Sequence, residues 1–278
     1  MLVFTCEQLR INRRNNMKLL FFDIDGTLIT DDPRRILPDS TKEAIRKTRE
    51  KGNMAFINTG RVFGNIDEFI KDAGFDGYVC GCGTYIRFRD EVLLHKTLSK
   101  ETCDEIALVS RKCRVCNLYE GAATTGIDRT LPITGDLLEL KNYFEQVRKV
   151  PFTSVGDEDF IFDKFAGWYD EESDLETFKE YITKDFEYIH RGEGFYEIVP
   201  KGYSKATGIQ FLCDFFNVSK EDCYAFGDSN NDLPMLSYVP HSIAMGESSE
   251  ELKKRVEYVT DGVLEDGIFN AMKHYGLC

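Results

Sequence analysis

Short apolar runs alternate with helical patterns in the first third of the chain. The runs lie at residues 18–23, 54–57 and 78–80, and each is too short for a buried helix. Continuous hydrophobic runs of this length are typical of strands buried on both faces of a parallel sheet. Helical spacing of apolar residues occurs between them, at 40–51 and 62–74. This alternation predicts an α/β fold with a Rossmann-like parallel sheet and helices on both of its faces.

The first of these helices has recognisable boundaries. Ser40 and Glu43 are spaced as a capping box, and Gly52 follows the last turn. In a capping box the two side chains bind backbone amides at the start of the helix. We therefore expect the helix to begin at Ser40.

The pattern changes in the middle of the chain and returns near residue 204. Residues 85–88 and 92–95 flank three charged residues, as the strands of a hairpin would, and a helix is expected over 100–112. Further signals lie at 160–168, 175–182, 186–190 and 196–199. The mixture predicts an inserted α+β domain. The expected division is an N-terminal extension at 1–16, a core domain at 17–82 and 196–278, and an inserted domain at 83–195.

Composition agrees with a folded chain of two domains. The 278 residues exceed the usual single-domain size of about 100–200 residues. The net charge is −13, which leaves no basic surface for nucleic acid. No apolar run approaches the ~20 residues of a membrane helix, and residues 1–16 lack the pattern of a signal peptide.

The nine cysteines favour a reducing compartment. Their odd number, in a chain too large to need covalent cross-links, predicts reduced thiols and a cytoplasmic location. Cys80-x-Cys82 and Cys113-x-x-Cys116 have the spacing of zinc half-sites. No histidine lies at ligand spacing beside them, which disfavours zinc.

Two acids stand where the first predicted strand ends, in the segment Asp23-Ile24-Asp25-Gly26-Thr27. Ligands of open parallel sheets bind beyond the carboxyl ends of the strands. Carboxylates two residues apart can converge on one centre, one as a nucleophile and the other to move protons. An Asp-Gly pair is also a common turn, so the segment alone fits both interpretations.

Phosphate-binding groups follow two other core elements. Thr59 and Gly60, after the second strand, offer a hydroxyl and an open backbone amide to a phosphate oxygen. Lys205 begins a helix, and its positive charge could neutralise the phosphate. The sequence fits two alternatives equally well: Lys205 could be an ordinary surface lysine, or the nearby Lys201 could bind the phosphate instead.

The last polar segment, Gly-Asp-Ser-Asn-Asn-Asp at 227–232, follows a predicted strand at 223–226. Its carboxylates suit a hard cation, and the same residues would also serve as a helix N-cap.

In this order the segments resemble the motifs of the haloacid dehalogenase (HAD) superfamily, in its Cof-type phosphatase branch with a C2B cap. The resemblance covers residues 17–278 and rests on Asp-x-Asp-Gly-Thr, Thr-Gly-Arg, the lysine and Gly-Asp-x-x-Asn-Asp. It implies that the inserted domain is a cap, a small α/β lid. The chain departs from the family at Cys82, where the family usually has Asn. This departure puts the substrate contacts at the entry to the cap in doubt.

The resemblance implies magnesium-dependent hydrolysis of a small-molecule phosphate monoester through an aspartyl-phosphate. Asp23 would attack phosphorus, and Asp25 would protonate the leaving alcohol and then deprotonate water. The implied Mg²⁺ ligands are Asp23, the carbonyl of Asp25, Asp228 and Asp232. The implied phosphate-binding residues are Gly26, Thr59, Gly60, Lys205 and Asn231. Arg61 could reach the leaving group or pair with an acid.

Two other functions stay open. Sugar phosphomutases share the acid pair and a similar cap, so transfer between two positions of one sugar is the alternative. A non-catalytic phosphate-binding regulator would be expected to have lost Asp23 or Asp25, and both are present. The sequence names neither the ester, which could be a sugar phosphate, a nucleotide or a cofactor phosphate, nor the oligomeric state.

Overall fold

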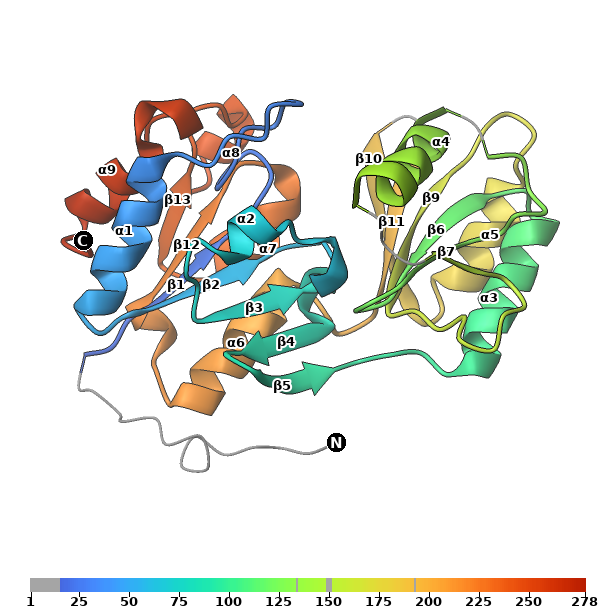
Figure 1. The fold of residues 1–278 in the computed structure, drawn as a ribbon, viewed down its shortest axis with the longest axis horizontal. Coiled ribbons are helices and arrows are strands. Elements are labelled where there is room, and N and C mark those ends of the chain that lie inside the picture. Colours follow the sequence, from blue (N-terminus) through green and yellow to red (C-terminus); the bar gives the residue numbers. More distant parts are fainter. Residues whose placement is uncertain (1–15, 134, 149–151, 193) are drawn as a thin grey trace. The chain divides into compact units, whose positions relative to one another are not determined.

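A computed structural model describes residues 16–133, 135–148, 152–192 and 194–278, so residues 1–15 of the expected extension lie outside the described residues. The chain divides into two compact units (Figure 1). Within the described residues, the core unit consists of residues 16–61, 66–95 and 203–278, and the inserted unit of residues 62–65 and the described part of 96–202. Among the helices of the described residues, none is long and apolar enough to cross a membrane.

The core unit is built on one eight-stranded sheet, with the order β14-β13-β12-β1-β2-β3-β4-β5. Neighbours from β14 to β3 are parallel, as the continuous apolar runs predict, while β4 and β5 are antiparallel. The strands are β1 (Leu19–Phe22), β2 (Met54–Asn58), β3 (Gly77–Cys80), β4 (Tyr85–Phe88), β5 (Glu91–His95), β12 (Cys223–Gly227), β13 (His241–Ala244) and β14 (Tyr258–Val259).

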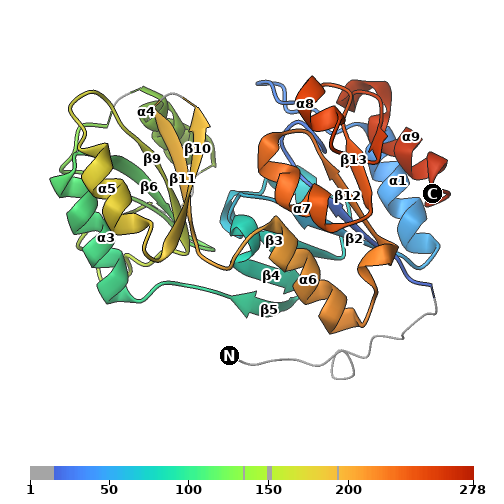
Figure 2. The same ribbon diagram turned by 180° about the vertical axis from the view of Figure 1, so that it is seen from behind.

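Helices cover both faces of this sheet (Figures 1 and 2). α6 and α7 lie on one face, where Leu212 and Met235 belong to the same buried cluster as Phe21 and Phe56. α1 and α9 lie on the other face and contact each other. The helices are α1 (Asp39–Glu50), α2 (Glu68–Lys71), α6 (Lys205–Phe216), α7 (Leu233–Tyr238), α8 (Glu250–Lys253) and α9 (Gly267–His274).

Two helices differ from the sequence predictions. The capping box of Ser40 is wrong, because α1 begins at Asp39 behind Pro38, whose extended backbone occupies the N-cap position. The helix expected over 62–74 is reduced to a 3-10 turn at Phe63–Asn65 and the four-residue α2. In the turn, the amide of Gly64 donates to the carbonyl of Ala122 at 2.8 Å instead of to a carbonyl one helical turn earlier.

The inserted unit is shorter at its start and longer at its end than the expected 83–195. The β4–β5 hairpin extends the core sheet through pairing with β3, so the unit begins at Lys96. Strand β11 pairs with β9 and β10 inside the inserted sheet, so the unit continues to Gly202. A hairpin pattern in the sequence cannot show which sheet the hairpin will join.

The inserted unit has a six-stranded sheet with the order β10-β11-β9-β6-β7-β8. α3 and α5 pack on one face around Tyr119, Phe165 and Phe178, and a smaller cluster with Leu118 and Leu137 joins α4 to the sheet. Its elements are α3 (Lys100–Lys112), β6 (Cys116–Glu120), β7 (Thr125–Ile127), α4 (Gly135–Asn142), β8 (Phe152–Ser154), β9 (Lys164–Trp168), α5 (Leu175–Ile182), β10 (Phe186–Gly192) and β11 (Phe195–Pro200).

Candidate active site

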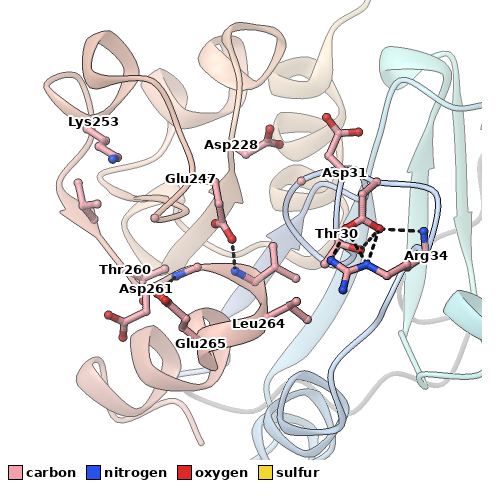
Figure 3. A pocket seen from close by; sticks show the side chains of 16 residues that line it. Thr30, Asp31, Arg34, Asp228, Glu247, Lys253, Thr260, Asp261, Leu264 and Glu265 are labelled. Atoms are coloured by element: carbon pink, nitrogen blue, oxygen red, sulfur yellow. Dashed lines mark hydrogen bonds and ion pairs between the residues drawn. The ribbon is translucent and has the colours of Figure 1, made fainter.

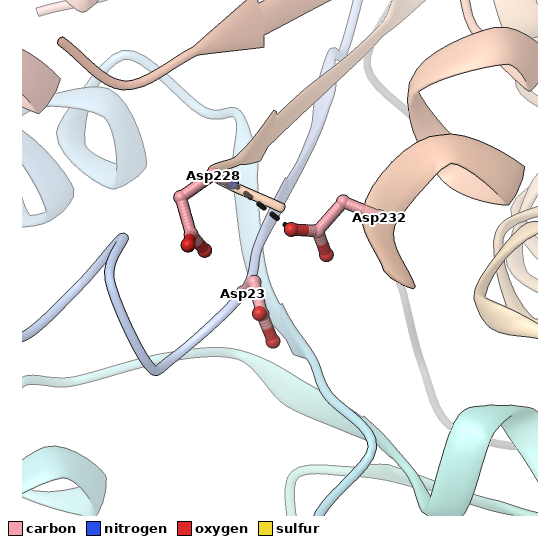
Figure 4. A group of neighbouring side chains, drawn as sticks. All are labelled: Asp23, Asp228 and Asp232. Carbon is pink, nitrogen blue, oxygen red and sulfur yellow. Dashed lines mark hydrogen bonds between the residues drawn. The ribbon is translucent and has the colours of Figure 1, made fainter. Parts of the chain in front are cut away.

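Three carboxylates meet at the carboxyl ends of β1 and β12 (Figure 4). Asp23 follows β1, and Asp228 and Asp232 follow β12. The two strands are parallel neighbours, and the amide of Asp23 donates to the carbonyl of Phe226 at 3.0 Å. One oxygen from each carboxylate lies within 4.8 Å of the others. The parallel sheet therefore brings together acids that are two hundred positions apart in the sequence.

Lys205 lies buried between two of these acids. Its Nζ is 2.7 Å from Asp23 Oδ1 and 2.6 Å from Asp232 Oδ1, and the residue is 2% exposed. The start of α6 is fixed by a capping box of Ser204 and Thr207. Lys201, the rival in the sequence, instead donates to the carbonyl of Lys184 at 3.0 Å within the inserted unit.

The site holds more negative charge than Lys205 balances. Burial and the charge of Asp232 raise the pKa of Asp23 to about 7 and that of Asp228 to about 8. Burial lowers the pKa of Lys205, but the neighbouring Asp23 and Asp232 outweigh it and raise that pKa. A bound cation would favour the ionised carboxylates, and carboxylate oxygens are the ligands that Mg²⁺ prefers. The residues present therefore fit a divalent metal.

Asp232 is held more firmly than the other two acids. It is completely buried, and its Oδ2 accepts hydrogen bonds from the amides of Asp228 at 3.0 Å and Ser229 at 3.2 Å. With Oδ1 bound to Lys205, both oxygens have partners. Asp23 and Asp228 are thus better placed to offer an oxygen directly to a metal.

Gly26 allows the loop after β1 to pass close to Asp228. Its φ is +71°, and a Cβ at this position would lie 2.4 Å from Asp228 Oδ2. The next residue, Thr27, donates its hydroxyl to Asp228 Oδ1 at 3.1 Å. Only glycine combines this backbone conformation with so close an approach.

The Thr59–Arg61 segment is fixed by the turn that follows β3. The amide of Cys82 donates to the carbonyl of Thr59 at 3.1 Å, and the amide of Gly81 donates to the carbonyl of Arg61 at 2.8 Å. Cys82 has a φ of +55°, in the left-handed region. Asn tolerates that region better than most residues, which gives a physical reason for the usual Asn at this position.

Arg61 pairs with an acid. Its Nε donates to Asp25 Oδ2 at 2.8 Å, its Nη2 binds the other oxygen of Asp25, and its Nη1 lies 3.3 Å from Asp67 Oδ2. Asp25 therefore lies beside Arg61, whereas Asp23 is paired with Lys205. Asn231 accepts a hydrogen bond from Ser229 Oγ at 2.6 Å.

Two contributors to the site were missed in the sequence. Asn58 donates from Nδ2 to the carbonyl of Lys205 at 2.9 Å and so ties β2 to the start of α6. It ends an apolar run and looks there like a strand terminus. Asp67 lies in an exposed-looking helical pattern, and no local signal in the sequence shows that it meets Arg61.

A pocket of ≈770 Å³ opens in the core unit beside Asp228 and Gly26 (Figure 3). Acidic side chains, such as Asp31 and Glu247, outnumber the basic ones in its lining. Glu247 is held by the amide of Val263 at 2.9 Å. The core unit therefore has room for a small molecule next to Asp228, which is the one of the three site carboxylates that lines this pocket.

The sequence pattern of one known family, haloacid dehalogenase-like hydrolase, matches residues 20–272. The chain belongs to this family. The match spans both units, and the strand order and the acids at the strand ends described above are found within it.

Similar proteins include phosphatases. YkrA of Bacillus subtilis, whose name describes it provisionally as a phosphatase, is 28% identical over 94% of this chain and 98% of its own. The 5-amino-6-(5-phospho-D-ribitylamino)uracil phosphatase YwtE of the same organism is 26% identical over 91% and 96%. The structure of BT4131, a HAD subclass IIB sugar phosphatase, is 28% identical, with a TM-score of 0.76, over 94% of this chain and 100% of its own. The chain is accordingly a phosphoric monoester hydrolase.

Proposed function

We propose that the chain is a magnesium-dependent phosphatase that hydrolyses a small-molecule phosphate monoester through an aspartyl-phosphate on Asp23. The observation that carries the proposal is the buried group of Asp23, Asp228 and Asp232 around Lys205, at the ends of parallel strands. This group combines a nucleophile, oxygen ligands for a cation and a fixed positive charge. Family membership and the phosphatases among its relatives support the same reaction.

In this mechanism Asp23 attacks phosphorus and the substrate alcohol leaves. Lys205, which already holds Asp23 Oδ1, provides a positive charge beside the phosphoryl oxygens, and Thr59 and the neighbouring amides provide donors. Asp25 gives a proton to the leaving alcohol and then takes one from the water that hydrolyses the intermediate. Gly60 and Asn231 are proposed as further donors to the phosphoryl group.

Asp23, Asp228 and the carbonyl of Asp25 would hold Mg²⁺, with Asp232 fixed behind them by Lys205. When bound, the metal supplies positive charge that allows the anionic phosphate to approach the anionic Asp23. Gly26 keeps the loop close enough for this set to assemble.

The names of two relatives support a narrower proposal for the substrate class. One is named as a sugar phosphatase, and another as a phosphatase of a ribitylamino phosphate. Both names describe a phosphate on a polyhydroxylated carbon chain. We therefore propose a sugar phosphate or sugar-alcohol phosphate as the substrate, ahead of nucleotides and cofactor phosphates.

Phosphate release from a panel of such esters, with Mg²⁺ and with a chelator, tests the proposal. Asp23→Asn should abolish turnover in a folded protein, because a neutral amide does not attack phosphorus. Asp90→Asn is the matched control, since the side chain of Asp90 is fully exposed. Full activity of Asp23→Asn would contradict the nucleophile. Interconversion of sugar phosphates that needs a sugar bisphosphate, without phosphate release, would favour the phosphomutase alternative.

A further inference from the structure

Four charged side chains of the core unit form a connected series that ends at Asp25. Arg61 binds both oxygens of Asp25, and its Nη1 lies 3.3 Å from Asp67 Oδ2. Arg35 binds the same Asp67 oxygen through Nη2. The order is Arg35, Asp67, Arg61, Asp25, with charges that alternate in sign.

Exposure rises from Asp67 through Arg61 to Asp25, while the side chain of Arg35, at the other end, is 28% exposed. The side chain of Asp67 is 11% exposed, that of Arg61 18% and that of Asp25 45%. Buried charges are costly unless each has a partner of opposite sign. Asp67 therefore provides the negative charge that the largely buried guanidinium of Arg61 requires. The same guanidinium also binds the more exposed Asp25.

Asp67 and Arg35, the two residues farthest from Asp25 in this series, both depart from common local structure. Asp67 occupies the N-cap position of α2, where an Asp side chain usually accepts a hydrogen bond from a helix amide, but it makes no such bond. Arg35 has a φ of +50°, in the left-handed region that strains residues with a side chain, and its Nε is buried without a hydrogen-bond partner in the described structure. Strain of this kind is common near functional sites.

We propose that Asp67 is a positioning residue that orients the carboxyl group of Asp25 through Arg61. The inference rests on the proposed function, in which Asp25 exchanges protons with the leaving alcohol. Among the described residues, the guanidinium of Arg61 is the only side-chain partner of Asp25. Because Asp67 binds Arg61 as well, the guanidinium stays in place while the Asp25 carboxyl turns to the alcohol. Proton transfer depends on this alignment within hydrogen-bond reach.

The test compares two esters in the full-length protein, because only one of them needs a proton for its leaving group. The alcohol of an alkyl phosphate must leave as a basic alkoxide unless Asp25 protonates its oxygen. The leaving group of 4-nitrophenyl phosphate is a stable phenolate, which needs no proton. For Asp67→Asn we expect kcat/KM with the alkyl phosphate to fall about tenfold, a fraction of the usual general-acid contribution. With 4-nitrophenyl phosphate kcat/KM should change less than about twofold, because kcat/KM does not include the later hydrolysis of the aspartyl-phosphate, in which Asp25 serves both esters alike.

Three further variants make the result specific. Asp67→Glu keeps the charge and should restore part of the alkyl phosphate rate. Arg35→Gln, in a partly exposed loop, should produce the same selective loss to a smaller degree and serves as the second variant if Asp67→Asn does not fold. Asp76→Asn is the matched structural control, since Asp76 is also buried and paired with an arginine, Arg49, at 3.0 Å. It should lower the Tm and leave the ratio of the two rates unchanged.

Equal losses of kcat/KM with both esters, in Asp67→Asn or Arg35→Gln, would overturn the positioning role. These outcomes are distinct from failure of the proposed function, because that is judged by the wild-type protein: phosphate release from either ester supports the function before any variant is compared.

Discussion

Lys205 is the only lysine or arginine that the described structure places between Asp23 and Asp232, and it is almost completely buried. Without it, two buried carboxylates would face each other without a fixed positive charge. At the scale of single residues, the site therefore depends on one cation that the sequence could not separate from Lys201.

Replacement of this lysine is the first prediction. Lys205→Met should lower kcat/KM by about a hundredfold or more, because the charge next to the phosphoryl oxygens is lost. It should also lower the Tm, since Asp23 and Asp232 remain buried without it. Lys201→Met, at an exposed position, should change neither quantity. Steady-state kinetics and thermal unfolding of both variants check this, and a larger effect at position 201 would contradict the assignment.

The second prediction concerns the replacement of Gly26. In Gly26→Ala the new Cβ would lie 2.4 Å from Asp228 Oδ2, so Asp228 must move. We expect the Mg²⁺ concentration needed for half-maximal activity to rise about tenfold. Gly202→Ala is the control, because Gly202 also has a positive φ of +84° but has no atom within 4 Å of the added Cβ.

The control variant separates steric displacement from backbone strain. Both substitutions place alanine in a left-handed conformation, which destabilises by about 1 kcal/mol. Only the change at Gly26 should alter the dependence on Mg²⁺. The same Mg²⁺ requirement in both variants would show that strain, rather than the contact with Asp228, governs the effect.

At the scale of elements, the strands of the core sheet were the most predictable part of the fold. The run at 18–23 contains β1, and the runs at 54–57 and 78–80 cover β2 and β3 except for one residue each, because strands buried on both faces must be apolar throughout. The sequence pattern did not predict β6, β7 or β8. These strands are short, and β6 contains the polar Asn117, which is buried because Tyr196 donates its hydroxyl to it at 2.7 Å.

Contacts between distant residues account for what the sequence left undecided at the site. The two acids after β1 and the acids after β12 could be expected at one end of a parallel sheet, since topology alone brings them there. The sequence could not predict whether Arg61 binds the substrate or pairs with an acid. It depends on Asp67, which directly precedes α2 and lies with Oδ2 3.3 Å from Arg61 Nη1.

The inserted sheet contains a buried ion-pair group that supports a third prediction. Lys164 on β9 lies 2.8 Å from Glu120 and 2.7 Å from Glu197, and Arg191 also binds Glu197. Burial raises the pKa of Glu197, but the charges of Lys164 and Arg191 outweigh it and lower the pKa to about 2. Glu197 therefore stabilises the folded unit in its ionised form.

The sign of the pH dependence follows from this shift. The folded pKa of about 2 is below the ordinary value of 4.5, so the stabilisation is complete above about pH 4.5 and is lost as the pH falls toward 2. Glu197→Gln should lower the free energy of unfolding by about 3 kcal/mol at pH 7, and by less at pH 3.5. Glu187→Gln, at an exposed position on the neighbouring strand β10, should have little effect at either pH.

Urea unfolding monitored by tryptophan fluorescence measures this difference in the free energy of unfolding for the inserted unit itself. The chain has one tryptophan, Trp168, which is on β9 and packs against Phe195 with ring centroids 4.9 Å apart. A difference between wild type and Glu197→Gln that stays constant from pH 7 to pH 3.5 would contradict the lowered pKa.

At the scale of the whole molecule, the two units divide the proposed tasks. Every residue proposed for chemistry belongs to the core unit, which has its own sheet and its own buried cluster. In the proposed mechanism these residues bind a cation and the phosphoryl group, and all phosphate esters share the phosphoryl group. Discrimination between esters therefore needs other residues, and the inserted unit is the largest part of the chain without a proposed catalytic role.

Removal of the inserted unit is the last prediction. A protein in which a flexible Gly/Ser linker replaces Lys96–Gly202 keeps the whole core sheet, including the β4–β5 hairpin that the sequence had assigned to the insert. We expect it to bind Mg²⁺ and to hydrolyse 4-nitrophenyl phosphate slowly, while the spread of kcat/KM across a panel of sugar and sugar-alcohol phosphates narrows to about tenfold or less. Circular dichroism and cooperative unfolding must first show that the shortened chain is folded. If the ranking of the esters is unchanged, selectivity resides in the core unit, and the pocket beside Asp228, with Asp31 and Glu247 in its lining, becomes the region to vary next.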